Sequence, residues 1–171
     1  MGNCVILRPN SISTKMRGIR FIGSSDAKAD AKGRIFFPAN FRKVMQEAGE
    51  EGMVMRKDVF QDCLVIYPES IWETQLEILR GKLSRWNSHE QNIFRQFTAD
   101  AEVLVPDANG RILLPRRYRD MVGIVQDVRF IGMDDVIEVW AREKVDAPFM
   151  SPEKFSEELE KLMDLSKDAA L

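Results

Sequence analysis

One short turn motif occurs twice in this chain, and the duplication restricts the possible folds more than any other feature. The first copy, D-A-K-G-R-I-F-F-P, runs from Asp30 to Pro38, and the second, D-A-N-G-R-I-L-L-P, runs from Asp107 to Pro115. Each copy continues in the same register into an aromatic residue and an arginine, namely Phe41-Arg42 and Tyr118-Arg119. Two copies are too few for a solenoid. The sequence therefore predicts a small unit that has been duplicated.

Each position of the motif has a physical role. Gly33 and Gly110 can take positive φ at no steric cost, as tight turns require. Asp30 and Asp107 stand where a short carboxylate can accept backbone N–H groups and close the turn. The apolar run after each arginine is at most four residues long, which favours a strand, and the proline that ends it suits the start of a helix. Each unit is thus predicted as strand, tight turn, strand and short helix.

The apolar pattern along the chain predicts an α+β, β-rich fold of two duplicated β-hairpin units. A unit of about 45 residues is near the size at which a lone core is marginal, so the two units are expected to share one core or to complete it with neighbouring chains. Predicted strands cover 19–29, 35–37, 53–56, 63–67, 101–105, 111–114, 128–131 and 136–140, and a short helix covers 39–48 and ends at Gly49. The expected divisions are an N-terminal extension (1–19), unit 1 (20–71), a helical linker (72–98), unit 2 (99–145) and a C-terminal amphipathic helix or tail (146–171).

The linker and the tail both show helical periodicity. Ser70 is predicted to cap the first linker helix and Ser88 the second, which runs through Phe97. The first helix carries an apolar stripe at Ile71, Leu76, Leu79, Leu83 and Trp86. In the tail, Ser151 and Pro152 begin a helix whose stripe is Phe155, Leu159, Leu162 and Met163. This helix is free to pack on the body, to contact a neighbouring subunit or to remain partly free.

Neither a membrane anchor nor a metal or cofactor site is predicted. Ile6 occupies the position where a myristoylation signal needs Ser or Thr, which argues against a lipid anchor. Residues 1–19 are instead predicted to be a disordered extension, or the chain is predicted to start at Met16. No apolar run reaches 18 residues. Cys63 is predicted as a buried free thiol, and a metal site would lack ligands because His89 is the only histidine. These features fit a reducing cytoplasm.

The same inventory argues against catalysis. His89 has no evident nucleophile or acid partner and is predicted to lie on the surface of a helix's first turn. Asp30 and Asp107 each stand beside their own turn glycine and arginine, as turn acids do. The glycines do not form a phosphate-binding loop of the P-loop or dinucleotide type. The chain is therefore predicted not to be an enzyme.

Nucleic-acid binding fits the charges better, although the net charge is −2. Basic residues outnumber acidic ones across each turn unit, from 28 to 43 and from 105 to 119. Arginine reads guanine from the major groove, and Arg34 and Arg111 are the first candidates for base contacts. Alternatively, each salt-bridges its own aspartate, and both roles can coexist. The candidates for phosphate contacts are Lys32, Arg42, Lys43, Arg116, Arg117 and Arg119.

From Phe21 to Val145 the sequence resembles the MraZ family, whose chains carry two SpoVT/AbrB-like units with a D-x-x-x-R signature at each turn. Phe21 and Gly23 also match the family's opening aromatic and glycine. The resemblance implies a cytoplasmic, nucleoid-associated transcriptional regulator that binds DNA direct repeats in the promoter of the division and cell-wall cluster and of its own gene. It also implies a ring-shaped homo-oligomer. The alternative is a scaffold module whose basic turns form ion pairs between subunits and do not bind DNA.

Overall fold

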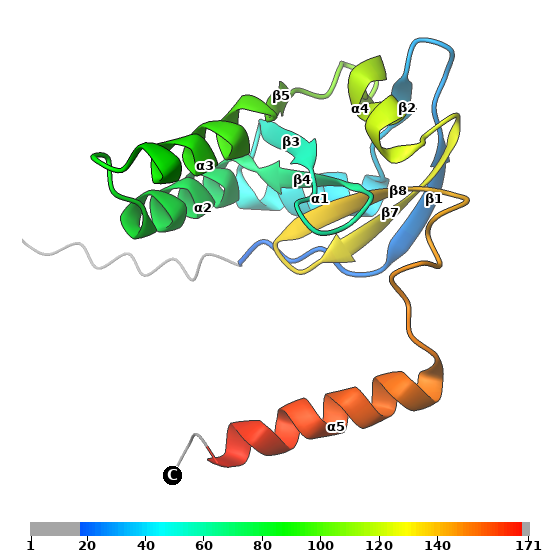
Figure 1. The fold of residues 1–171 in the computed structure, drawn as a ribbon. Helices are drawn as coiled ribbons and strands as arrows, with labels where there is room; N and C mark the ends of the chain where they lie inside the picture. Colours follow the sequence, from blue (N-terminus) through cyan, green and yellow to red (C-terminus); the bar gives the residue numbers. More distant parts are fainter. Residues whose placement is uncertain (1–17, 169–171) are drawn as a thin grey trace, which may run out of the picture.

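The computed structural model describes residues 18–168, with side chains through Asp164 (Figure 1). The expectations about Met16 as a start and about residues 1–17 of the extension lie outside the described residues. The predicted α+β, β-rich class is confirmed. In chain order the elements are β1 (Ser24–Lys28), β2 (Arg34–Phe36), α1 (Ala39–Ala48), β3 (Met53–Lys57), β4 (Leu64–Pro68), α2 (Glu69–Lys82), α3 (Ser88–Ala99), β5 (Glu102–Leu104), β6 (Arg111–Leu113), α4 (Arg116–Val122), β7 (Asp127–Met133), β8 (Val136–Ala141) and α5 (Pro152–Asp168).

The strands of the two copies are interleaved in the sheets. The large antiparallel sheet has six strands in the order β1-β7-β8-β4-β3-β5, so that strands of the first copy lie beside strands of the second. The two strands flanking each turn separate: β1 joins β7 in the large sheet, whereas β2 pairs antiparallel with β6 in a two-stranded ribbon. A three-residue strand buries one side chain only. Pairing β2 with its duplicate combines the buried Ile35 and Ile112 on one inner face.

Both copies contribute to a single hydrophobic core, as their small size predicted. Phe21 meets Phe41 edge to face with ring centroids 5.5 Å apart, and Phe37 from the first copy meets Phe130 from the second at 6.1 Å. Tyr118 is fully buried in the same core. Such aromatic contacts add about 0.5–1.5 kcal/mol each beyond the area they bury. The units are therefore joined by packing as well as by strand pairing.

A smaller cluster lies on the other side of the large sheet. It contains Cys63, Val65, Trp140 and Val145. Cys63 is a buried free thiol, as predicted, and its burial raises the pKa of that thiol. Apolar side chains thus cover both faces of the large sheet.

The predicted caps of the linker helices are wrong by one or two positions. α2 begins after Pro68 without a side-chain cap, and Ser70 lies inside the helix with its hydroxyl bonded to Glu50. α3 is capped by Asn87, whose Oδ1 accepts the backbone N–H groups of His89 and Glu90 at 3.0 and 3.2 Å. Asparagine is among the preferred N-cap residues, and its Oδ1 accepts both amides from one residue before Ser88.

The linker helices are attached to the large sheet through aromatic contacts. The sequence pattern predicts that Phe97 faces the core, but the apolar stripe predicted for the first helix does not include Trp72. Trp72 is the buried residue of α2, and it stacks on Phe97 of α3 with ring centroids 5.4 Å apart. The Arg56 guanidinium, from β3, lies 4.2 Å from the Phe97 ring centroid. Trp86 was predicted in the apolar stripe but lies in the loop after α2 and is almost fully exposed.

Helix α5 lies apart from the body in Figure 1, at the end of a connecting segment that is mostly turn. Its cap follows the prediction, since Ser151 Oγ accepts the Lys154 N–H at 3.3 Å. Its apolar residues Phe155, Leu159 and Leu162 are exposed. Within residues 18–168, no helix is long and apolar enough to cross a membrane.

Candidate nucleic-acid interface

The two turns have nearly identical hydrogen bonding. In the first, Asp30 Oδ1 accepts the backbone N–H groups of Lys32 and Arg34 at 3.0 and 2.9 Å. In the second, Asp107 Oδ1 accepts those of Asn109 and Arg111, both at 2.9 Å. Each aspartate thus holds the backbone of its own turn through one oxygen.

The glycine of each turn adopts the conformation that its position predicted. Gly33 has φ of 87° and Gly110 has φ of 76°. The N–H of each glycine donates to the carbonyl of the turn aspartate at 2.9 Å. Positive φ is strained for any side chain with a Cβ, so the glycines permit the reversal that the aspartates then fix.

The second oxygen of each aspartate binds the arginine side chain of the same turn. Arg34 Nε lies 2.7 Å from Asp30 Oδ2, and Arg111 Nε lies 2.8 Å from Asp107 Oδ2. The donated backbone N–H of Arg34 and its guanidinium lower the pKa of the Asp30 carboxyl, and Arg111 does the same for the pKa of Asp107. Within the described part of the chain, the terminal Nη atoms of both arginines make no hydrogen bond.

Strand pairing places both arginines on one face of the β2–β6 ribbon. The register pairs Arg34 with Leu113, Ile35 with Ile112 and Phe36 with Arg111. Because alternate residues of a strand share a face, the outer face of the ribbon consists of Arg34, Phe36, Arg111 and Leu113. The two arginines occupy one diagonal of this square, roughly 7–8 Å apart at their backbones.

A groove of about 370 Å³ lies between the two turns on this face. Its cationic lining residues come from both copies, and its apolar lining comes from β6 and from Val105, which follows β5. It is lined by Lys32, Arg34, Val105, Asp107, Arg111, Ile112 and Leu113. The sequence motif alone placed these turns far apart in the chain, and the β2–β6 pairing brings them together.

Two of the predicted phosphate contacts lie against the turn of the opposite copy. Arg119 Nε donates to the Leu114 carbonyl at 3.0 Å, and a methyl group added to Gly33 would lie 3.0 Å from that nitrogen. A methyl group added to Gly110 would collide with the terminal guanidinium of Arg42. Each helix arginine therefore lies over the turn glycine of the other copy.

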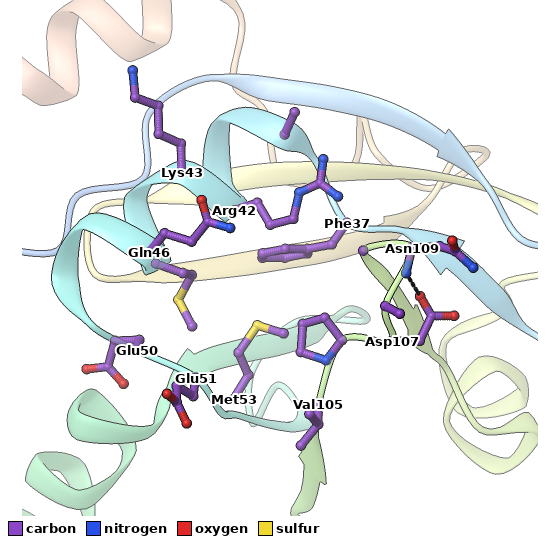
Figure 2. Close-up of a pocket in the computed structure, with 15 residues that line it drawn as sticks. Phe37, Arg42, Lys43, Gln46, Glu50, Glu51, Met53, Val105, Asp107 and Asn109 are labelled. Carbon is purple, nitrogen blue, oxygen red and sulfur yellow. Dashed lines mark hydrogen bonds between the residues drawn. The ribbon is translucent and has the colours of Figure 1, made fainter.

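Figure 2 shows Arg42 extending from α1 toward the second turn, beside Asp107 and Asn109. It borders a groove of about 590 Å³ whose floor includes Phe37 and Met53. Glu50 and Glu51 lie at the opposite end of this groove, as Figure 2 also shows. The cationic end of the groove thus adjoins the second turn and its acidic end lies away from it.

The other predicted phosphate contacts are exposed. Lys43 and Arg116 each face an acid one turn along their own helix, Glu47 at 3.9 Å and Asp120 at 3.5 Å. Arg117 lies over the Tyr118 ring, 4.4 Å from its centroid. Lys32 stands at the tip of the first turn and lines the groove between the turns.

Sequence reasoning missed two residues of the ribbon face, Phe36 and Leu113. They were counted only as members of the apolar runs that predict strands, yet their exposed fractions are 62% and 49%, against 1% for both Ile35 and Ile112. The available signal was strand alternation, since a buried residue at 35 requires residues 34 and 36 to face outward together.

The residues considered for catalysis or metal binding lie apart from one another. His89 lies exposed on the first turn of α3, as predicted. Asp30 and Asp107 are each engaged by their own arginine. The described residues contain no group of three or more His, Cys, Asp or Glu side chains that could hold a metal ion.

The fold interleaves the strands of two copies and places the arginines of both D-x-x-x-R turns on one β-ribbon. These features define a class of duplicated proteins. The family model described as "MraZ protein, putative antitoxin-like" matches residues 21–96 and again residues 97–165, one match for each copy. This chain belongs to the MraZ family.

Its similarity to individual relatives extends over most of their length. A protein of Bacteroides thetaiotaomicron is 57% identical over 146 residues, which cover 85% of this chain and 94% of the relative. One of Phocaeicola vulgatus is 54% identical over 153 residues, covering 90% and 99%. One of Serratia proteamaculans is 30% identical over 150 residues, covering 83% and 98%. All three are named "Transcriptional regulator MraZ".

Proposed function

We propose that this chain is a DNA-binding transcriptional regulator that presents the outer face of the β2–β6 ribbon to DNA. The observation that carries the proposal is the position and the hydrogen bonding of the two turn arginines. Arg34 and Arg111 lie on one face, and each is oriented by its aspartate through Nε while its Nη atoms remain available. The names of the relatives support a role in transcription.

The available nitrogens match what a guanine offers. Guanine presents O6 and N7 as two acceptors in the major groove, and a guanidinium can donate to both. A major groove about 12 Å wide admits a two-stranded β-ribbon. An arginine already held by an ion pair loses less conformational freedom on binding than a free one. The proposed phosphate contacts around this face are Lys32, Arg42, Lys43, Arg116, Arg117 and Arg119.

One ribbon offers few base contacts, so the proposal includes a homo-oligomer. A ring would present several ribbons to direct repeats in the DNA, and linked sites raise the overall affinity by 10²–10⁴-fold when their geometry allows simultaneous contact. The proposed targets are the promoter of the division and cell-wall cluster and the chain's own promoter. The proposed location is the cytoplasm, in association with the nucleoid.

The test is a fluorescence-anisotropy titration with DNA from upstream of the chain's own gene, at several salt concentrations. The Arg34→Ala/Arg111→Ala variant is compared with wild type and with Arg129→Ala. Arg129 is a matched control, since it also binds an aspartate, Asp26, but on the large sheet. We expect binding to weaken about 10- to 100-fold for each arginine that loses a bidentate guanine contact, and to be unchanged for Arg129→Ala.

Two results would contradict this function. Wild type that binds no upstream fragment would exclude the regulator assignment. A turn variant with an altered oligomeric mass would instead support the scaffold alternative, in which Arg34 and Arg111 form ion pairs between subunits. Mass is therefore measured by light scattering for every variant before the titrations.

A further inference from the structure

We infer that Phe36 and Leu113 are specificity-determining residues that contact thymine methyl groups in the major groove. This inference rests on the proposed function and extends it from guanine reading to a second base. It begins with the two apolar side chains that the ribbon exposes, with exposed fractions of 62% and 49%. Burial of the alternate residues Ile35 and Ile112 accounts for the ribbon's inner face but gives no reason for apolar residues outside.

The placement of these side chains is the first argument. Each stands directly opposite an arginine, Leu113 against Arg34 and Phe36 against Arg111. Directly paired residues have Cβ atoms about 4.5–5.5 Å apart. Successive bases of one DNA strand are about 3.4 Å apart along the axis. An apolar side chain paired with a guanine-reading arginine therefore reaches the neighbouring base.

The chemistry of the major groove is the second argument. Thymine alone among the four bases carries a methyl group there, and apolar side chains, phenylalanine included, make contact with it. The exposed Phe36 and Leu113 are the only uncharged members of the four-residue ribbon face defined by the β2–β6 register. Each arginine and the apolar residue opposite it thus match two neighbouring bases, a guanine and a thymine.

The surrounding charges favour DNA over a second copy of the chain as the occupant of this face. Leu113 lines the same groove as Lys32, Arg34 and Arg111. An apolar protein surface covering Leu113 would also bury the guanidinium ends beside it, which is costly for charges without partners. A nucleic acid supplies acceptors for those guanidinium ends and a methyl group for the leucine.

The experiment removes the methyl groups from the DNA. The upstream fragment is amplified with either thymidine or deoxyuridine triphosphate, which changes only the 5-methyl group and leaves the pairing edge intact. Full-length wild type and the Phe36→Ala/Leu113→Ala variant are titrated with both fragments. We expect wild type to bind the thymine DNA more tightly, by about fourfold for each methyl group contacted. The variant should bind both DNAs equally.

A matched control separates this effect from a general consequence of exposed apolar residues. Phe60 is 90% exposed on the β3–β4 loop, and Phe60→Ala should keep the wild-type preference for thymine DNA. The inference is overturned if wild type does not distinguish the two DNAs, or if the ribbon variant keeps the wild-type ratio. A changed oligomeric mass in that variant would also overturn it and assign the face to subunit contact. Wild type that binds neither DNA contradicts the proposed function itself.

Discussion

At the scale of single residues, the two turn glycines have the same conformation but different surroundings. At Gly33 a Cβ would lie 2.6 Å from the Leu114 carbonyl oxygen, which is backbone and cannot move away without disturbing the ribbon. At Gly110 the obstructing atoms belong to the end of the flexible Arg42 side chain. Sequence similarity between the copies gives no sign of this difference, because it depends on what the opposite copy places above each glycine.

We therefore predict that Gly33→Ala destabilises the protein more than Gly110→Ala. Both substitutions strain the backbone by about 1–2 kcal/mol, and only Gly33→Ala adds a backbone collision, for a total of about 3 kcal/mol or more. Urea unfolding measures the free energy of unfolding of both variants. Gly49→Ala is the control, since Gly49 has φ of 74° with nothing within 4 Å of its added Cβ. Equal losses for Gly33 and Gly110 would contradict the prediction.

The turn aspartates give a prediction for pH. Arg34 and Arg111 lower the pKa of Asp30 and Asp107 in the folded chain relative to the ordinary value of about 3.9. A depressed pKa stabilises the fold above the unfolded value, and that contribution is lost as pH falls through the folded pKa. Wild type should thus be more stable than Asp30→Asn/Asp107→Asn at neutral pH, and the difference should shrink below about pH 4.

Urea unfolding of both proteins between pH 3 and 7 measures this difference. Other carboxyl groups titrate in the same range, but their contributions cancel when the variant is subtracted from wild type. A difference that stays constant down to pH 3 would show that the two carboxylates do not stabilise the turns through their charge.

At the scale of elements, the linker helices depend on a few aromatic contacts with the large sheet. Phe97 stacks on Trp72 and lies under the Arg56 guanidinium, so it joins α3 to α2 and to β3. We predict that Phe97→Ala lowers the free energy of unfolding by about 2–3 kcal/mol, less than for a fully buried phenylalanine because Phe97 is only partly buried.

Hydrogen exchange locates the effect of Phe97→Ala. Amides of α2 and α3 should exchange faster, whereas those of β7 and β8, which Phe97 does not contact, should change little. Phe60→Ala is again the control because its side chain is exposed. Uniformly faster exchange throughout the chain would mean that the helices and the sheet unfold as one unit.

The elements also show what local sequence can and cannot predict. Helix α1 was predicted correctly at 39–48 with Gly49 at its end, and most strands within two residues, because alternation, glycine and proline act locally. The first strand is the exception, since it was predicted over 19–29 and β1 begins only at Ser24. Partner strands were not predictable. The pairing of β2 with β6 joins residues far apart in the chain, and nothing in either strand distinguishes its duplicate from its own neighbour. The exposure of Phe36, in contrast, could have been predicted from strand alternation, because Ile35 beside it is buried.

At the scale of the whole molecule, this interleaving determines how the chain can be divided. β1 of the first copy pairs with β7 of the second, β4 pairs with β8, and β3 pairs with β5. Phe37 and Phe130 join the copies through the core. The β2–β6 ribbon also joins the copies, so cutting the chain between them would break four strand pairings and divide the core.

We therefore predict that residues 18–98 and 99–168, produced separately, do not fold. Each half loses the strand partners named above and keeps too few residues for a stable core. Circular dichroism and thermal unfolding should show no cooperative transition for either half. An equimolar mixture should regain native near-ultraviolet signal from Trp140, which is buried in the complete protein. A half that unfolds cooperatively alone would contradict the shared core, and the duplicated unit would then be an independent domain.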